Sequence, residues 1–410
     1  MTGGGARLLT ETAPGQMRAL LYDDGRVVEA WHDFAHDPDL TGSVHRVRID
    51  RVFATQNRAT ARLADGTAIS IRTSRRDSFD PGDLVTVTIT AARREDKPWQ
   101  AMPGARLAGK HVILLPGEAG IATSSRMTEP PAADVMALLT AILDASPGYG
   151  VILRRDAGTA DDLPACLSDL ITTWTEGSTD VAGDGCVFDG GGLSGQVRRH
   201  YPGLPVEDVG PAAADRFAGD WDAMIEGCLS DEVRLASGGC LWIEATRAVT
   251  AIDLDSGRGP LASLLAEAPV VIASQLRLRQ TGGLVAIDVP RASKAASAGF
   301  DAALDAALAG DPRHPERIGR TRGGLVELRL PHGRSGPAVW AADMMVTGAL
   351  SVLRDVALRP ALAVARIELP AAMADWLRGP GAPALAALDR PVELVVSSHA
   401  PAATLIEVPR

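Results

Sequence analysis

The chain has 410 residues, 46% of them hydrophobic and 22% charged, and a formal net charge of −10. The length predicts roughly two to four domains, because one compact core rarely grows so large. The acidic balance excludes a protein that binds nucleic acid over its whole surface, since such affinity comes largely from neutralised phosphates, although a local groove stays compatible with it. The four cysteines form no Cys-x-x-Cys pair, so neither a zinc site nor a disulfide framework is predicted.

The sequence also carries no pattern that predicts targeting to a membrane. The first five residues, MTGGG, lack the basic and apolar regions of a signal peptide. No apolar run has the length that we expect of a membrane span. The prediction is therefore a cytoplasmic protein with no membrane partner.

The N-terminal part of the chain predicts strands. Residues 17–31 read as two strands around a turn at residues 23–25. Residues 44–90 contain alternating polar and apolar stretches and a hairpin turn at Asp65-Gly66. Several short strands with tight turns in about fifty residues are typical of a small barrel.

Helix and strand patterns alternate in the rest of the chain, which predicts a layered α/β architecture. The Gly- and Asp-rich residues 176–197 predict loops, residues 331–337 a linker, and residues 338–410 a tail of helix, strand, helix and strand. The remaining expected elements are a strand at 111–115, a helix at 130–145, a strand at 151–153, a helix at 160–174, a helix at about 212–230, strands around 233, 241–243 and 249–252, a helix at 261–278 and a strand at 284–287.

Two of these apolar strands end in a carboxylate. Residues 249–252 lead into Asp253, with Asp255 two positions later, and residues 284–287 lead into Asp288. Functional groups of an open α/β sheet gather beyond the carboxyl ends of its strands. Two carboxylates there can share a hard cation such as Mg²⁺, which activates water and neutralises phosphodiester charge. Aspartate at a strand end is also a common turn former or helix cap, so the spacing alone leaves both interpretations open.

Longer motifs around these aspartates resemble the ribonuclease E/G family. Residues 231–239, DEVRLASGG, resemble the family run REVRLPSGG, and residues 243–253 continue in step with its EALTAIDIN. Residues 275–288 are similar to QLRLRDLGGLIVID, and residues 322–328 to RFGLLEM. The motifs are in order and correctly spaced, which makes the resemblance specific, and weaker similarity extends from about residue 17 to the end.

The resemblance implies a multidomain α/β fold. Family members carry an RNase H-like domain interrupted by an OB-fold barrel and by a segment that senses the RNA 5′ end. A DNase I-like catalytic domain, a zinc-link and a small C-terminal domain follow. On this chain we expect a shortened, discontinuous RNase H-like domain at 16–45 and 178–226, an S1-like OB-fold RNA-binding domain at 46–103, a 5′-sensor-like segment at 104–177, a DNase I-like catalytic domain at 227–335 and a small α/β C-terminal domain at 338–410.

The resemblance also implies an activity, that of a hydrolytic endoribonuclease of RNA processing or decay. Asp253 and Asp288 match the two metal-binding aspartates, which would hold Mg²⁺ or, in its place, Mn²⁺. Asp255 lies at the edge of this site, where the family has Asn. Arg322 matches an arginine near the cleavage site. The expected partner is single-stranded RNA.

The remaining expected substrate contacts are less direct. Arg155 matches the arginine that grips a 5′ monophosphate, and Gly109 and Ile113 match the wall of that pocket. Arg277 and Arg279 are candidates for positioning the RNA backbone, with plain helix-surface charges as the alternative.

Several departures from the family pattern favour a second hypothesis, a non-catalytic RNA-binding or scaffold protein that keeps the fold. Asp156 replaces the Thr of the 5′ pocket and sets an acid beside a phosphate. Arg62 and small residues stand where the family's barrel has aromatics for base stacking. The Cys-Pro-x-Cys zinc-link is absent, so we expect no zinc and no zinc-linked tetramer, and a homodimer stays compatible with the sequence.

Overall fold

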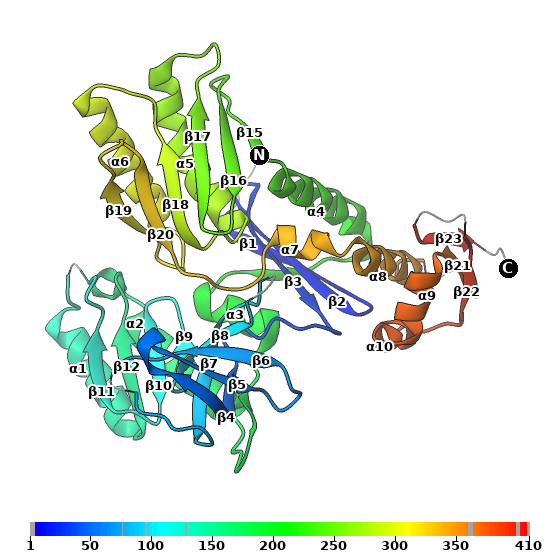
Figure 1. Cartoon of the computed structure of the whole chain (residues 1–410), viewed down its shortest axis with the longest axis horizontal. Helices are drawn as coiled ribbons and strands as arrows, with labels where there is room; N and C mark the ends of the chain where they lie inside the picture. Colours follow the sequence, from blue (N-terminus) through cyan, green and yellow to red (C-terminus); the bar gives the residue numbers. More distant parts are fainter. Residues whose placement is uncertain are drawn as a thin grey trace.

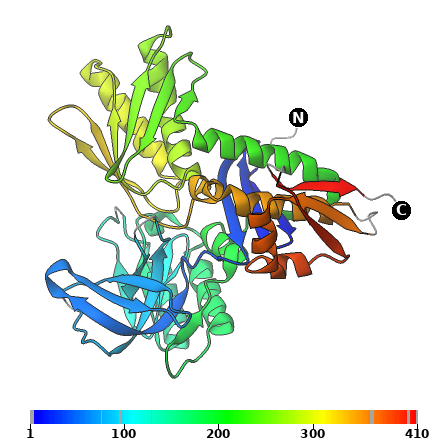
Figure 2. The same cartoon turned by 45° about the vertical axis from the view of Figure 1, so that its right-hand side comes forward.

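The computed structural model describes residues 5–75, 77–94, 97–127, 129–359, 364–398 and 402–407 of the chain. Figure 1 shows three parts over these residues: an upper lobe of residues 231–330, a lower lobe of residues 44–177 and an arm of residues 337–407. The N-terminal strands lie where the three parts meet (Figures 1 and 2). The architecture is mixed α/β with several sheets, as the sequence predicts.

The N-terminal sheet joins residues that lie far apart in the sequence. Its strands, in spatial order, are β14 (Val206–Asp208), β1 (Arg7–Ala13), β2 (Gln16–Asp23) and β3 (Arg26–Phe34). One face packs against α3 (Gly192–His200) and the other against α4 (Ala214–Leu229), which follows the short 3-10 turn η3 (Pro211–Ala213). The strand pair predicted at 17–31 is confirmed by β2 and β3.

The loop predicted at residues 176–197 is wrong in part. This stretch contains β13 (Gly185–Phe188) and the start of α3. Leu193 and Val197, one helical turn apart on α3, are buried against the N-terminal sheet. The burial of that apolar pair outweighs the poor helix propensity of the surrounding glycines, because tertiary packing routinely overrides local preference.

A closed five-stranded barrel forms the front of the lower lobe and is consistent with an OB-like domain. Its apolar centre contains Val47, Ile49, Ile69, Ile71 and Val87, which alternate with outward-facing residues along their strands. The strands, in order around the barrel, are β4 (Val44–Phe53, followed by the 3-10 turn η1, Ala54–Gln56), β5 (Arg58–Arg62), β6 (Ala68–Arg72), β8 (Trp99–Pro103) and β7 (Leu84–Ala91), which pairs again with β4. The small barrel predicted from the short strands is confirmed.

The second sheet of the lower lobe carries two helices on one face. Leu139 of the first helix and Leu163 and Leu167 of the second pack against Leu114 and Val151 of the strands. The elements are β9 (Leu107–Ala108), β10 (Val112–Pro116), β11 (Gly120–Thr123), α1 (Ala133–Ala145), β12 (Tyr149–Leu153), the 3-10 turn η2 (Ala157–Thr159) and α2 (Leu163–Gly177). The helices predicted at 130–145 and 160–174 are confirmed within a few residues.

The upper lobe is a six-stranded sheet that is covered by helices on one face. The sheet order is β15 (Glu232–Arg234), β16 (Cys240–Ala245), β17 (Val249–Asp255), β18 (Gly283–Asp288), β20 (Val326–Leu330) and β19 (Glu316–Arg320). The helices α5 (Leu261–Leu278) and α6 (Lys294–Leu308) pack against the buried side chains of this sheet in one hydrophobic core. Neither α5 nor α6 packs on the opposite face of the sheet, which is called the open face below.

The helix α5 corrects one expectation from the sequence. Its 18 residues have a mean hydropathy of 1.4, so by length and composition it is apolar enough to cross a membrane. The prediction that no apolar run has such a length is therefore wrong. Leu264, Ile272 and Leu276 of this helix are buried against the sheet, and this packing accounts for an apolar helix in the core of a domain.

The C-terminal arm is a small α/β unit. Its elements are α7 (Pro337–Ala342), α8 (Met344–Ala357), β21 (Ala365–Leu369), α9 (Ala371–Arg378), α10 (Ala382–Ala386), β22 (Val392–Val396) and β23 (Thr404–Glu407). The predicted helix–strand alternation is confirmed, with additional short elements. The preceding segment is no free linker, because Arg334 is buried and paired with Glu29 of β3.

Candidate active site

Asp253 and Asp288 lie side by side at the ends of two neighbouring strands. β17 and β18 run parallel, and the register pairs Asp253 with Asp288. Both aspartates are exposed, whereas the preceding residues, Ile252 and Ile287, are buried. Since side chains alternate along a strand, both carboxylates project from the open face of the sheet, with backbones about 4.8 Å apart.

The sequence motif beside these aspartates has a packing reason. Ser237, Gly238 and Gly239 form the turn between β15 and β16, and Glu267 of α5 accepts hydrogen bonds from the Ala236 and Ser237 amides at 2.7 and 2.9 Å. A Cβ atom at Gly239 would lie 2.5 Å from the carbonyl oxygen of Asp255. Glycine is therefore required where the turn meets the end of β17. The sequence did not reveal Glu267 as the residue that holds this turn.

Asp255 lies on the same open face, two residues beyond Asp253. One of its carboxylate oxygens accepts a hydrogen bond from the Gly257 amide at 2.8 Å. This contact is an Asx turn of the kind that follows many strands. Asp255 thus shapes the loop at the edge of the site, while its second oxygen adds negative charge there.

Basic residues surround the two aspartates in the loops at this end of the sheet. Arg258 follows β17, while Arg291 and Lys294 follow β18. Arg322 lies in the β19–β20 hairpin, which meets β18 where Ile287 pairs with Val326, next to Asp288. These four side chains are exposed, so an acidic protein carries a local basic rim around a pair of carboxylates. Of the four, only Arg322 was expected from the sequence.

Arg155 lies in a contact between the two lobes. Its guanidinium donates a hydrogen bond to the carbonyl oxygen of Pro315 at 3.2 Å. Arg154 beside it donates to the carbonyls of Gly109 at 2.6 Å and Pro312 at 2.8 Å. Burial lowers the pKa of Arg154 to about 10, against the opposing charge of Asp156. The loop before β19 thus occupies hydrogen-bonding positions that were expected to meet a 5′ phosphate.

Asp156 is held by a histidine of the same segment. Its carboxylate receives a hydrogen bond from Nδ1 of the buried His111 at 3.0 Å. Burial raises the pKa of Asp156, but this bond and the charges of His314 and His111 outweigh burial and leave the pKa below its usual value. His111 thus satisfies one carboxylate oxygen of Asp156, while the other, Oδ1, is buried without a hydrogen-bond partner among the described residues.

The two residues expected as the pocket wall have packing roles. A Cβ atom at Gly109 would lie 3.0 Å from a methyl group of Leu170 on α2. Ile113 is half-buried in β10, opposite Ile152 of β12. Gly109 thus allows the close approach of α2, whereas Ile113 alternates with Val112 and Leu114, which pack in the core beneath α2.

Arg277 and Arg279 do not lie at the aspartate edge. α5 starts after the carboxyl end of β17 and returns, so its last turn reaches the opposite end of β18. Arg279 donates hydrogen bonds to the carbonyls of Gly227, Cys228 and Ser230, which satisfies the end of α4. Arg277 pairs with Glu29 at 2.9 Å. The structure therefore assigns both arginines to domain contacts, which differs from the expected RNA contact and from the alternative of free helix-surface charges.

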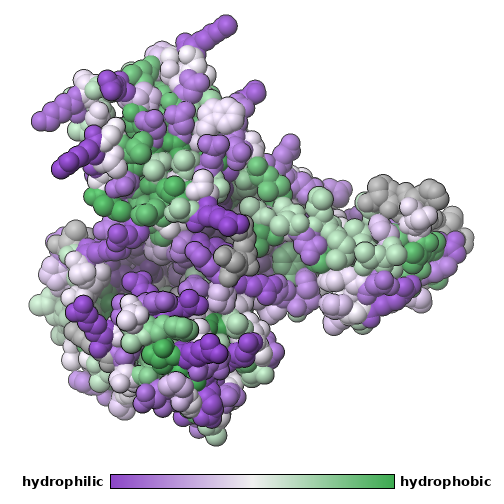
Figure 3. All heavy atoms as spheres, in the orientation of Figure 1, coloured by the Kyte–Doolittle hydropathy of each residue, from purple (hydrophilic) through white to green (hydrophobic). Residues whose placement is uncertain are grey.

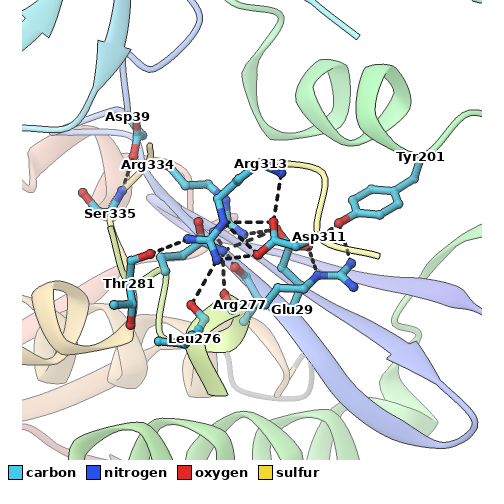
Figure 4. A network of polar contacts seen from close by, with 12 residues as sticks. Glu29, Asp39, Tyr201, Leu276, Arg277, Thr281, Asp311, Arg313, Arg334 and Ser335 are labelled. Carbon is cyan, nitrogen blue, oxygen red and sulfur yellow. Dashed lines mark hydrogen bonds and ion pairs between the residues drawn. The ribbon is translucent and has the colours of Figure 1, made fainter. Parts of the chain in front are cut away.

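A buried polar network surrounds Glu29 and joins the N-terminal sheet to the upper lobe (Figure 4). Glu29 accepts hydrogen bonds from Arg277, Arg334 and Tyr201. Burial alone would raise the pKa of Glu29, but Arg334 and Arg277 bring it down to about 2. The carboxylate is thus kept charged in the interior by two guanidinium groups, and none of this network was foreseen from local sequence patterns.

The fold and the site define a multidomain α/β protein with a carboxylate pair and basic loops at one sheet edge. Residues 217–329 match the model of the ribonuclease E/G family, which supports the resemblance carried by the sequence motifs. Among similar proteins, ribonuclease E of Haemophilus influenzae is 43% identical over 75 residues, which cover 16% of this chain and 8% of that protein. Ribonuclease E of Escherichia coli strain K12 is also 43% identical over 75 residues, covering 16% and 7%.

A chloroplast relative gives a longer match. The ribonuclease E/G-like protein of Arabidopsis thaliana is 30% identical over 106 residues, which cover 23% of this chain and 10% of that protein. The similar stretches thus span at most a tenth of these relatives. The family match includes Asp253, Asp288 and Arg322, whereas the barrel and Arg155 lie outside it.

Proposed function

We propose that this protein is a metal-dependent endoribonuclease that hydrolyses single-stranded RNA in RNA processing or decay. The observation that carries the proposal is the register of Asp253 and Asp288, side by side on the open face of a sheet within the family match. The basic rim described above supports it, because phosphates need positive charge beside the carboxylates.

The two aspartates suit Mg²⁺. This cation takes oxygen ligands and is usually bound by one or two carboxylates, with waters and substrate phosphate completing its shell. Among the described residues no group of three or more His, Cys, Asp or Glu side chains could hold a metal ion. A donor set of two carboxylates is too small for a closed four-ligand zinc site and sufficient for Mg²⁺ or Mn²⁺.

The residues would divide the reaction between them. Asp253 and Asp288 would hold a cation, which would supply charge neutralisation at the scissile phosphate and a lower pKa for an attacking water. Arg322 and Arg291 bind the flanking phosphates from the loops that border β18. The attacking water gives up a proton to solvent as its oxygen forms a bond to phosphorus, the bond from phosphorus to the 3′ oxygen breaks, and that oxygen takes up a proton. The products are a 5′-phosphate and a 3′-hydroxyl.

The proposal is tested by incubating the full chain with labelled, 5′-monophosphorylated single-stranded RNA. We expect internal cleavage with Mg²⁺ or Mn²⁺, no cleavage in a chelator, and protection of the same sequence in a duplex. The Asp253→Asn protein, purified in parallel, controls for contaminating nuclease. RNA that stays uncut by the wild-type protein across a range of both cations would refute the proposal.

The second candidate is a non-catalytic RNA-binding or scaffold protein. It is favoured by the contacts of Arg154 and Arg155, which the protein uses for its own packing, and by the net charge of −10. Under this hypothesis RNA binds without being cut, and replacing either aspartate only tightens binding at low salt.

A further inference from the structure

An exposed tryptophan lies directly beside the aspartate pair. Trp242 of β16 pairs in register with Asp253, on the side away from Asp288. Its neighbours along the strand, Leu241 and Ile243, are buried in the core beneath the sheet, so the indole projects from the open face. Trp242, Asp253 and Asp288 thus form one row across three strands, with cross-strand side chains about 5 Å apart at Cβ.

Trp242 differs in burial from the other tryptophans. It is 42% exposed, whereas Trp174 and Trp376 are partly buried and the remaining four, Trp31, Trp99, Trp221 and Trp340, are 4–6% exposed. Indole is a large apolar group that stabilises a protein most when it is removed from water. Within the described part of the chain no helix covers Trp242, because α5 and α6 pack on the other face of the sheet. Figure 3 shows apolar surface on the upper lobe with hydrophilic side chains at its border.

The surroundings of the indole indicate what could cover it. Cys240, two residues before Trp242 on the same strand, pairs with Asp255, so the open face beside the indole carries Asp255 as well as Asp253. Docking of another protein's apolar surface would bury these carboxylates without partners, which is costly. A nucleotide has complementary chemistry: its base is a flat apolar surface, and its phosphate can share a cation with Asp253 and Asp288.

We propose that Trp242 is a stacking platform for an unpaired base next to the scissile phosphate. The inference rests on the proposed function and deepens it, because it identifies a source of single-strand selectivity. A base within a duplex has both faces stacked and must be unpaired before it can lie on the indole. Stacking tolerates any base, so the contact selects unpaired strands with little sequence preference.

Binding is measured by fluorescence anisotropy with a labelled adenosine 12-mer and with an abasic 12-mer of the same charge. The protein carries Asp253→Asn, so that Mg²⁺ can be present without cleavage. Adding Trp242→Ala should weaken binding of the adenosine strand roughly 5- to 150-fold, the range of one base–aromatic contact, and leave the abasic strand unchanged. Trp242→Phe should restore most of the loss. Leu284→Ala, another exposed apolar position on β18, is the matched control and should have no effect.

A second readout does not depend on the stability of the alanine variant. The adenosine strand should quench tryptophan emission of the protein, and the quenched component should be missing in Trp242→Phe. The proposal would be overturned if the ratio of adenosine-strand to abasic-strand affinity were the same in the protein with Trp242 and in its Trp242→Phe and Trp242→Ala variants. The proposal would also be overturned if the wild-type protein were a dimer and Trp242→Ala were a monomer with an unchanged affinity ratio. A second copy of the chain would then cover the indole. Failure of the proposed function is seen separately, as uncut RNA in the cleavage assay.

Discussion

The aspartate edge of the upper lobe and the arginine contact of the lower lobe use charged residues in opposite ways. Asp253 and Asp288 project from an open sheet face into solvent. Arg154 and Arg155 donate their hydrogen bonds to carbonyls of Pro312 and Pro315 in the other lobe. Both regions carry residues that the family resemblance singles out. A residue of a family motif can bind a ligand only if its polar groups are not already paired with other residues of the same protein.

The difference between the two regions follows from burial. A guanidinium removed from water must find acceptors, since an unpaired buried charge is strongly unfavourable. The carbonyls before β19 supply them, and Arg126 adds an ion pair to Glu316 at 2.8 Å in the same contact. Carboxylates at the edge of an uncovered sheet have no such requirement, because water solvates them. The lower lobe thus uses its arginines for docking, and the upper lobe keeps its acids for a ligand.

The largest effect is expected from Asp253→Asn or Asp288→Asn. Each change removes a ligand that a hard cation needs, and the loss of several kcal/mol of transition-state stabilisation lowers cleavage roughly a thousandfold. RNA affinity should be unchanged or slightly higher, because a negative charge facing phosphate is removed. Gel assays of cleavage and a binding titration on the same proteins measure both. Asp255→Asn is the control and should keep activity. Equal losses of activity in all three variants would show that Asp255 contributes as much to the site as Asp253 and Asp288.

The next effect concerns the stability of the contact between the N-terminal sheet and the upper lobe. Glu29→Gln leaves Arg277 and Arg334 buried without their carboxylate. We expect the free energy of unfolding to fall by about 3–5 kcal/mol, as when one partner of a buried pair is removed. Urea denaturation followed by circular dichroism measures the change. Glu232→Gln, at a surface pair with Arg234, should change it by less than about 1 kcal/mol; similar values for both would contradict this assignment.

Acid should lower the stability of the folded chain through two buried histidines. Burial, with help from Arg154, lowers the pKa of His314 from 6.5 to about 4, and burial lowers that of His32 from 6.5 to about 3. Between pH 6.5 and these values the unfolded chain binds protons that the folded chain does not, so stability falls as pH decreases. Glu29, with its pKa near 2, adds a further loss below pH 4.5.

Thermal unfolding at a series of pH values tests this dependence. The melting temperature should be constant above about pH 7 and decrease steadily toward pH 4. His314→Gln should make the decrease shallower. A melting temperature that does not change between pH 7 and pH 5 would contradict the burial of these histidines.

A smaller effect is expected from Arg155→Ala on the 5′-end preference. Because Arg155 already donates to Pro315 and Asp156 is held by His111, monophosphate binding should be weak. Cleavage rates of 5′-monophosphate and 5′-hydroxyl RNA should agree within roughly threefold, both in the wild-type protein and in the variant. This ratio corresponds to a difference in activation free energy of less than about 1 kcal/mol. A strong preference for the monophosphate that disappears in Arg155→Ala would show that the arginine contact opens to bind the phosphate.

The smallest effect is expected from the removal of zinc. Without a Cys-x-x-Cys pair in the sequence, chelation should leave the oligomeric state unchanged. Light scattering after size exclusion, with and without chelator, and elemental analysis of the purified protein measure this. A zinc-containing assembly that dissociates in the chelator would show that ligands distant in sequence have replaced the zinc-link.

Local sequence patterns determined the elements of the aspartate edge. The apolar runs before Asp253 and Asp288 are strands, and the helical spacing of residues 261–278 coincides with α5. A strand, a crossover helix and a second strand place both carboxyl ends at one edge, so the proximity of the aspartates followed from connectivity. The barrel followed similarly from alternation and turns. These features depend on residues that are close in the sequence, so the spacing of apolar residues predicts them.

Tertiary structure alone decided which side chains are free. In sequence, Trp242 between Leu241 and Ile243 looks like part of a buried strand, and it is exposed because α5 and α6 pack on the other face of the sheet. Arg277 looks like a helix-surface charge, yet it meets Glu29, 248 residues away. α3 forms in a glycine-rich stretch because Leu193 and Val197 find a sheet to pack on. In each case the partner comes from a distant segment, and the burial free energy that selects the outcome exists only once the segments meet.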